Sequence, residues 1–249
     1  MEIRSSNPVL KQSFWNNVNG HDRMTIDGSL QKIGLLLGLT VLTAFVTAVL
    51  ALTSDNPLML PAMVGLGFMG GFVLALIIMF VRPQNPAPLM TMYALFEGMA
   101  IGGVSIIFEA AYDGIVLQAA FGTVGITATM YLMYASKVIR PTPMFNKVIG
   151  GLVISIMFLY LTSYLLRFLT GMDVPFLHTS GPIGIGLTAF ILVIASLTLI
   201  SDFGFIESGS RYGAPKNMEW YAAFGILVSL IWIYVETLRL LSKLQALRD

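Results

Sequence analysis

The sequence predicts an all-α protein that crosses a membrane seven times. The chain is 56% hydrophobic and 11% charged, with a mean hydropathy of +0.81, whereas soluble domains carry roughly 25% charged residues. It divides into seven apolar stretches, each close to the about twenty residues that a helix needs to cross ~30 Å of hydrocarbon. The breaks between the stretches are short and rich in turn-forming residues. These three observations favour a bundle of transmembrane helices.

A polar segment precedes the first apolar stretch. Residues 1–30 lack the short apolar core of a signal peptide, so we expect a tail that stays in the cytoplasm. Residues 31–249 are expected to form one seven-helix transmembrane domain, because no later break is long enough to be a linker. The net charge of +1 gives no reason to expect a nucleic-acid partner. The absence of cysteine excludes thiolate metal sites and a cysteine nucleophile.

Turn-forming residues set the boundaries of the expected helices. Residues 54–57 end in proline, and residues 82–88 contain three prolines. Asp113-Gly114 makes a tight hairpin, residues 140–143 hold two prolines, and residues 208–216 form a loop. The expected helices are 33–52, 58–81, 89–112, 115–136, 148–169, 182–206 and 218–244.

Basic residues collect in alternate loops, and this sets the expected orientation. The tail and the loops after the second, fourth and sixth helices are basic, whereas the opposite loops are mostly acidic. We therefore expect the N-terminus in the cytoplasm. Seven crossings then place Arg239, Lys243 and Arg248 outside, which is contrary to the rule. The basic residues of the expected cytoplasmic loops are Arg82, Lys137, Arg140, Lys147, Arg211 and Lys216.

A glycine pattern in the second stretch has a structural explanation. Residues 65–70 match the dinucleotide-binding pattern GxGxxG. They lie inside an apolar run, however, with no strand before them and no acidic residue about twenty positions later. We interpret the pattern, together with Gly67/Gly71 and Gly98/Gly102, as small residues that let neighbouring helices pack closely.

Carboxylates inside apolar stretches are the strongest functional signal. A charged carboxylate at the centre of a transmembrane helix costs at least about 2.5 kcal/mol, so such residues usually face inward and mark an ion or proton path. Asp202 and Glu97 are the deepest, in the cytoplasmic halves of the sixth and third helices. Glu207 and Glu219 flank the next loop, and Glu236 lies toward the opposite face. The acids therefore form an inner and an outer layer.

The shallower acids also have a simpler explanation. Glu207, Glu219 and Glu236 lie near helix ends, where a carboxylate can be solvated or at headgroup depth. Glu236 is three residues before Arg239, a spacing that allows an ion pair on one helix face. This explanation is weaker for the deeper acids, Asp202 and Glu97.

Several short motifs occur in a recognisable order. Leu95-Phe96-Glu97-Gly98 lies on the third helix, Asp202 closes the sixth, and residues 234–241 make an acidic, aromatic final helix. This order resembles the Bax inhibitor-1 (TMBIM) family, most closely its bacterial branch. The resemblance implies that six helices surround the seventh and that a pair of acids on helices six and seven senses pH. It also implies a pH-dependent calcium leak, here across a bacterial inner membrane.

The resemblance makes Asp202 the helix-six member of the acid pair and leaves two candidates on helix seven. Tyr234-Val235-Glu236 is similar to the family's tyrosine–hydrophobic–aspartate motif. In an antiparallel hairpin, however, Asp202 should face about position 224, which is near Glu219 and roughly 18 Å from Glu236. We therefore expect Asp202 to pair with Glu219. Arg82, at the end of the second helix, is the expected counterpart of the family's arginine latch.

Such a pair suggests a mechanism. Two carboxylates a few ångströms apart in a low-dielectric site cannot both ionise cheaply, so they share a proton. At lower pH the proton holds helices six and seven together, and at higher pH repulsion separates them or recruits a cation. Oxygen ligands suit Ca²⁺, although Asp202 and Glu219 alone make only a weak site. We expect a calcium or proton leak without a cofactor, and solvated side chains at His21 and His178.

Three other functions remain open. A non-conducting regulator could use the same helices to bind a membrane protease or another integral-membrane partner. An intramembrane aspartyl protease would need two aspartates at one depth, whereas Asp113 and Asp202 are expected on opposite sides. A secondary transporter would need broken helices in two matching halves, which the sequence does not show. We therefore expect no enzymatic activity.

Overall fold

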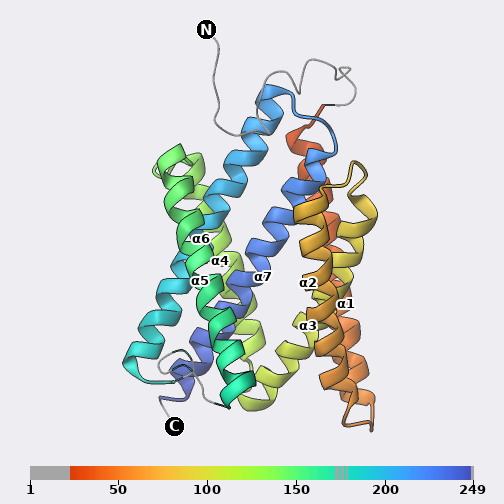
Figure 1. Cartoon of the computed structure of the whole chain (residues 1–249), viewed down its shortest axis with the longest axis vertical. Coiled ribbons are helices and arrows are strands. Elements are labelled where there is room, and N and C mark those ends of the chain that lie inside the picture. Colours follow the sequence, from red (N-terminus) through yellow and green to blue (C-terminus); the bar gives the residue numbers. More distant parts are fainter. Residues whose placement is uncertain (1–22, 172–173, 175–176, 178, 248–249) are drawn as a thin grey trace.

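The computed structural model describes residues 23–171, 174, 177 and 179–247, and this part of the chain contains seven α-helices (Figure 1). Each helix is long and apolar enough to cross a membrane. The prediction of an all-α, polytopic membrane protein is therefore confirmed. The helices are α1 (Ile26–Thr53), α2 (Met59–Val81), α3 (Ala87–Ala111), α4 (Ile115–Ala135), α5 (Pro143–Thr170), α6 (Pro182–Tyr212) and α7 (Met218–Gln245).

The first helix starts earlier than its apolar stretch. α1 begins at Ile26 rather than at residue 33, because the Thr25 side chain caps it by accepting a hydrogen bond from the Gly28 amide at 3.0 Å. Such a cap satisfies one of the free amides at a helix start. α1 therefore includes residues 26–30, which the sequence pattern assigned to the tail.

Two further helices are longer than expected. α5 begins at Pro143, after Thr142 caps it by accepting a hydrogen bond from the Phe145 amide at 3.2 Å. Proline is favourable at the first position of a helix, where its missing N–H is not needed. α6 continues past residue 206 to Tyr212 and ends at Gly213, which has a φ of 71° that favours glycine.

The last helix is the central one. α7 runs through the middle of the bundle, with α1, α2 and α3 on one side and α4, α5 and α6 on the other (Figure 1). It packs against α1, α3, α4 and α6, and its Trp232 packs on the cluster that holds Ile156 of α5. α2 packs mainly on α3, and α5 packs on α6. α2 and α5 therefore form an outer layer around a core centred on α7.

The two ends of the bundle differ in charge. α1, α3, α5 and α7 begin at one end, uppermost in Figure 1, where α2, α4 and α6 finish. We call this the basic end and the opposite one the far end. The described basic residues at or near the basic end are Arg23, Lys32, Arg82, Lys137, Arg140, Lys147, Arg211 and Lys216.

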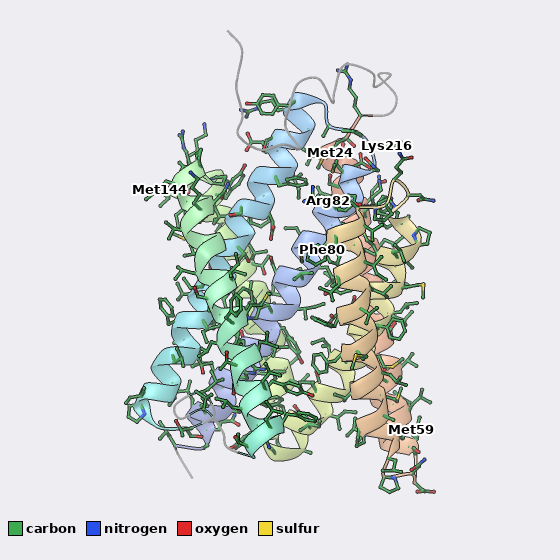
Figure 2. The ribbon with its side chains drawn as sticks, viewed as in Figure 1. Met24, Met59, Phe80, Arg82, Met144 and Lys216 are labelled. Carbon is green, nitrogen blue, oxygen red and sulfur yellow. The ribbon has the colours of Figure 1, made fainter. Side chains whose placement is uncertain are left out.

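Large apolar side chains cover the outside of the bundle. Phe80 of α2 is 77% exposed and Met144 of α5 is 71% exposed, and both are labelled in Figure 2. Similar side chains lie on every helix. Contiguous apolar surface on this scale is typical of contact with a membrane rather than with water.

Small residues allow three helices to approach closely. A Cβ atom on Gly67 of α2 would lie 2.5 Å from the amide nitrogen of Ala100 on α3. A Cβ atom on Gly98 of α3 would lie 2.5 Å from the carbonyl oxygen of Thr40 on α1. The backbones are therefore too close for any side chain at these positions. The interpretation of the glycine pattern as a packing device is confirmed for Gly67, Gly71, Gly98 and Gly102, whereas a Cβ atom on Gly65 would have no atom within 4 Å.

Candidate ion and proton site

Asp202 lies where α6 crosses α7. Its Oδ2 accepts a hydrogen bond from the Ser229 hydroxyl at 2.6 Å. Its Oδ1 lies 3.3 Å from the position that a Cβ atom would occupy on Gly225, so the carboxylate fits against the α7 backbone. This register agrees with the antiparallel hairpin expected from the sequence, which placed Asp202 opposite about residue 224.

A cavity of about 430 Å³ lies beside Asp202 at the basic end. Because a water molecule occupies about 30 Å³ in the liquid, this volume can hold several waters. The Ser201 hydroxyl donates to Asn146 Oδ1 at 2.9 Å and adds polar atoms to the wall. The lining residues are Pro141, Asn146, Ser201, Asp202, Gly204, Phe205, Ser208, Tyr221, Ala222 and Gly225.

Polar side chains extend from Asp202 about one helical turn further toward the far end, as far as Thr198 and Ser229. Thr198 Oγ1 lies 3.0 Å from Ser229 Oγ, within hydrogen-bonding distance. Beyond these hydroxyls, α6 and α7 meet through buried apolar side chains, among them Ala195 and Ile233. This layer lies between the cavity and the polar groups near the far end. Packed apolar side chains therefore separate the cavity from those polar groups in the described part of the chain.

Glu219 has partners other than Asp202. It is fully buried at the start of α7 and forms an ion pair with Lys32 of α1. It also accepts hydrogen bonds from the Thr25 amide at 2.9 Å and from the Thr25 hydroxyl at 3.0 Å. The structure does not bring the expected Asp202–Glu219 pair together. Glu219 lies in the first turn of α7, about 9 Å along the helix axis before Gly225, and α1 supplies a cation for it there.

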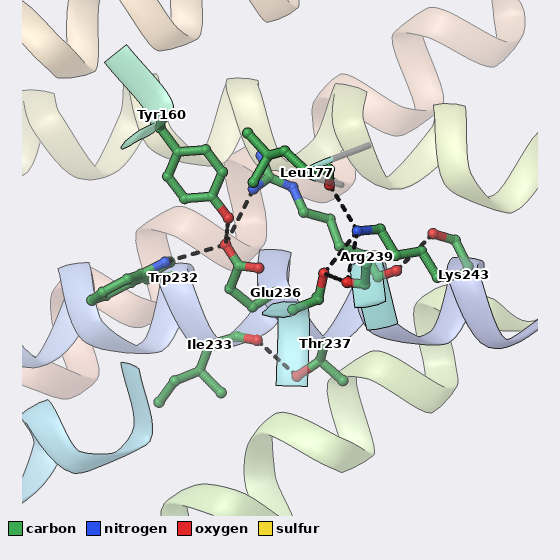
Figure 3. A network of polar contacts seen from close by, with 11 residues as sticks. Tyr160, Leu177, Trp232, Ile233, Glu236, Thr237, Arg239 and Lys243 are labelled. Atoms are coloured by element: carbon green, nitrogen blue, oxygen red, sulfur yellow. Dashed lines mark hydrogen bonds and ion pairs between the residues drawn. The ribbon is translucent and has the colours of Figure 1, made fainter. Parts of the chain in front are cut away.

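Glu236 lies near the far end and is buried, not solvated, with 1% of its surface exposed. Its Oε1 accepts hydrogen bonds from the Tyr160 hydroxyl at 2.7 Å, from Trp232 Nε1 at 3.3 Å and from Arg239 Nη1 at 3.1 Å (Figure 3). The ion pair expected between Glu236 and Arg239 is confirmed. Glu236 is roughly 10 Å along α7 from Ser229, so it too lies apart from the cavity.

Lys243 is a buried residue that sequence reasoning missed. It is 8% exposed, and its Nζ donates to the carbonyl oxygens of Leu177 at 2.8 Å and Gly184 at 3.1 Å and to Thr188 Oγ1 at 2.9 Å (Figure 3). The only available signal was the spacing of seven residues from Glu236, which puts both on one face of α7. Lys243 therefore has three hydrogen-bond partners inside the protein, and Arg239 has an ion pair with Glu236.

Comparison with known protein families places the chain in one of them. The sequence model of one family, described as Bax inhibitor 1 like, matches residues 7–246. The chain belongs to this family. No curated protein and no solved structure was found to match it. The resemblance drawn from the glutamate–glycine motif, Asp202 and the final helix is therefore confirmed.

Two other residues expected at the site lie apart from Asp202 in this member of the Bax inhibitor 1 like family. Glu97 is half-buried on α3 and points at α2, where a Cβ atom on Gly71 would lie 2.7 Å from its Oε1. Arg82 is exposed at the end of α2, and its Nε donates to the Met79 carbonyl at 3.4 Å. Neither residue lines the cavity at Asp202.

Glu207 lies near the end of α6 and is partly exposed. Its two oxygens accept hydrogen bonds from the Tyr134 hydroxyl and from Arg211, with which it forms an ion pair. Glu207 therefore joins α4 to α6, one and a half turns closer to the basic end than Asp202.

The described part of the chain contains no group of three or more histidine, cysteine, aspartate or glutamate side chains that could hold a metal ion. The weak calcium site expected from Asp202 and Glu219 is not assembled in this conformation, because the two carboxylates have different partners. His21 and His178, which were expected to be solvated, lie outside the described residues.

Proposed function

We propose that this Bax inhibitor 1 like protein is a pH-sensitive leak pathway for cations, calcium among them, across a bacterial inner membrane. The observation that supports it best is the carboxylate of Asp202 in the wall of a cavity at the basic end. Asp202 is ten residues before the end of α6, or roughly 15 Å along the helix axis. A titratable group at that depth, next to space for water, is typical of an ion or proton path.

The basic end is proposed to face the cytoplasm. Basic residues in short loops favour that side of a membrane. Arg239 and Lys243, the described cations near the far end of α7, have partners within the protein. The cavity at Asp202 is then an entrance on the cytoplasmic side. The apolar layer that includes Ala195 and Ile233 is the barrier that must open.

Protonation of Asp202 would control this barrier. A charged carboxylate in low-dielectric surroundings is unfavourable unless water or a counter-ion reaches it. When Asp202 is neutral, its contact with Ser229 keeps α6 and α7 together. When Asp202 loses its proton as the pH rises, the charge favours wider separation of the helices and entry of water and a cation. Cation flux should therefore increase with pH.

The oxygen atoms near the cavity suit a hard cation only weakly. Asp202 contributes the one carboxylate, and Ser229, Thr198 and Ser201 contribute hydroxyls. Ca²⁺ usually takes six to eight oxygen ligands, so this set favours passage of calcium rather than tight binding. In this proposal a single carboxylate replaces the acid pair that the family resemblance implied.

Calcium entry into liposomes that enclose a calcium-sensitive dye tests the proposal. Wild-type protein should admit Ca²⁺ faster as the pH rises between about 6 and 8, a range reached by carboxyl groups in buried sites. Asp202→Asn should flatten this pH dependence. Asp55→Asn, a change at an exposed residue near the far end, should leave it intact.

Two outcomes would contradict the proposal. A pH response that survives Asp202→Asn would place the sensor elsewhere. Absence of calcium entry at every pH, with protein that is folded and correctly inserted, would favour the alternative: a non-conducting regulator that binds a membrane protease or another integral-membrane partner.

A further inference from the structure

A second cavity, of about 550 Å³, adjoins the first at the basic end. The two share Pro141, Gly204 and Ser208 in their walls. The second cavity differs in its charge, because three basic side chains line it with a single carboxylate. The polar and charged side chains in its wall are Tyr134, Lys137, Arg140, Glu207, Ser208, Arg211 and Tyr212.

The turn after α4 places two of these cations. Lys137 has a left-handed backbone, with a φ of 64°, and it reverses the chain directly after the helix. Glycine or asparagine adopts this conformation more easily than lysine does. A lysine at this position therefore has a small conformational cost. The turn places Lys137 and Arg140 in the cavity wall.

The cations of the turn have no anionic partner in the described part of the chain. The carboxylate in the wall, Glu207, is bound by Tyr134 and by the third cation, Arg211. Neither Lys137 nor Arg140 forms an ion pair with a described residue, and both are exposed. The cavity therefore keeps an excess of positive charge with free N–H donors, the chemistry that recognises phosphate oxygens.

The surroundings of the cavity are apolar. Val138, between the two turn cations, is 70% exposed. Met144 is 71% exposed in the first turn of α5, at the same end of the bundle (Figure 2). Tyr212, in the cavity wall, is 52% exposed. Aromatic and basic residues are common at the level of lipid headgroups, and exposed apolar side chains next to them contact acyl chains.

We propose that this cavity binds the phosphate group of an anionic phospholipid from the leaflet at the basic end. Lys137 and Arg140 contact the phosphate oxygens. Arg211 lies next to these two residues, and its ion pair with Glu207 fixes its position. Val138 and Met144 lie along the acyl chains. Basic pockets between transmembrane helices on the cytoplasmic side are a known way to hold anionic headgroups. The proposal concerns binding alone, so it does not depend on calcium conduction.

Native mass spectrometry of the purified full chain tests the proposal, with phosphatidylglycerol, phosphatidylcholine or inorganic phosphate added in separate titrations. Phosphatidylglycerol should bind more tightly than phosphatidylcholine, and inorganic phosphate should not compete with it at equal concentration. The double variant Lys137→Gln/Arg140→Gln should weaken phosphatidylglycerol binding about thirtyfold, because each basic residue near an anionic surface contributes roughly fivefold.

The matched control removes the same two types of charge elsewhere at the basic end. Arg82→Gln/Lys216→Gln changes two exposed residues outside the cavity and should leave phosphatidylglycerol binding within about twofold of wild type. All four residues are exposed, so both double variants should fold, and circular dichroism checks this. Equal loss in the two double variants would overturn the proposal, since it would show attraction by net charge alone. Displacement of the lipid by inorganic phosphate at equal concentration would overturn the assignment of a lipid as the ligand.

Discussion

Replacement of Glu219 by glutamine separates a structural role from a sensing role. Glutamine keeps the size of the side chain and an oxygen that can accept hydrogen bonds from Thr25. It removes the charge that balances Lys32, whose side chain is 18% exposed. Removing one partner of a buried ion pair costs about 3–5 kcal/mol. Because Lys32 is partly exposed, we expect a loss near the lower limit, about 3 kcal/mol.

The loss can be measured by unfolding in detergent micelles, followed by circular dichroism. A loss of about 3 kcal/mol corresponds to a fall in Tm of about 6–12 °C in soluble domains of this size. The double variant Glu219→Gln/Lys32→Gln should be more stable than Glu219→Gln by at least about 1 kcal/mol, because neither charge is then left without its partner. Asp55→Asn, at an exposed carboxylate, should change stability by less than about 0.5 kcal/mol.

The functional half of this prediction concerns the pH dependence of calcium entry. Glu219→Gln should leave that dependence in place at a temperature where the protein is folded, because Glu219 is paired with α1 and lies outside the cavity. Asp202→Asn should flatten it. The reasoning fails if Glu219→Gln is as stable as wild type, or if it flattens the pH response as Asp202→Asn does.

Two further predictions concern stability and use the same unfolding measurement. Gly98→Ala should lower the free energy of unfolding by about 1–3 kcal/mol, because its Cβ would enter the α1 backbone. Gly38→Ala, with no atom within 4 Å of its Cβ, should leave that free energy unchanged or raise it. Equal effects of the two substitutions would show that α1 and α3 are not so close. Tyr160→Phe should lower the free energy of unfolding by about 1–2 kcal/mol, because it removes a hydrogen-bond donor to buried Glu236. Tyr164→Phe, at a residue that is 68% exposed, should change it little. An unchanged stability for Tyr160→Phe would mean that this hydrogen bond is unimportant.

The number and approximate position of the helices could be predicted, and some of their ends could not. Hydropathy locates a span because hydrocarbon accepts only long apolar segments. Helix ends are set by single capping residues, which hydropathy does not detect. With Thr25 as its cap, α1 therefore begins at Ile26, seven residues earlier than expected. With Gly213 as its cap, α6 ends at Tyr212.

The candidate site shows the same division. Asp202 could be found from its depth alone, and its position opposite residue 225 followed from counting back along an antiparallel hairpin. Its hydrogen bond with Ser229 could not be found, because a count along the axis does not say which faces of two helices meet. Glu219 had the better axial position, but a cation on a helix distant in sequence, Lys32, binds it.

The sequence by itself determined that this chain has seven membrane-spanning helices and that Asp202 is an unusual ionisable residue within one of them. Both follow from one physical fact, the high cost of moving polar groups into hydrocarbon. Only the tertiary structure decided how the remaining acids are used. Glu219 binds α1 and Glu236 binds Tyr160 and Arg239. Most buried polar groups in proteins have hydrogen-bond partners, and the rotation and crossing of the helices determine which partners on other helices are within reach.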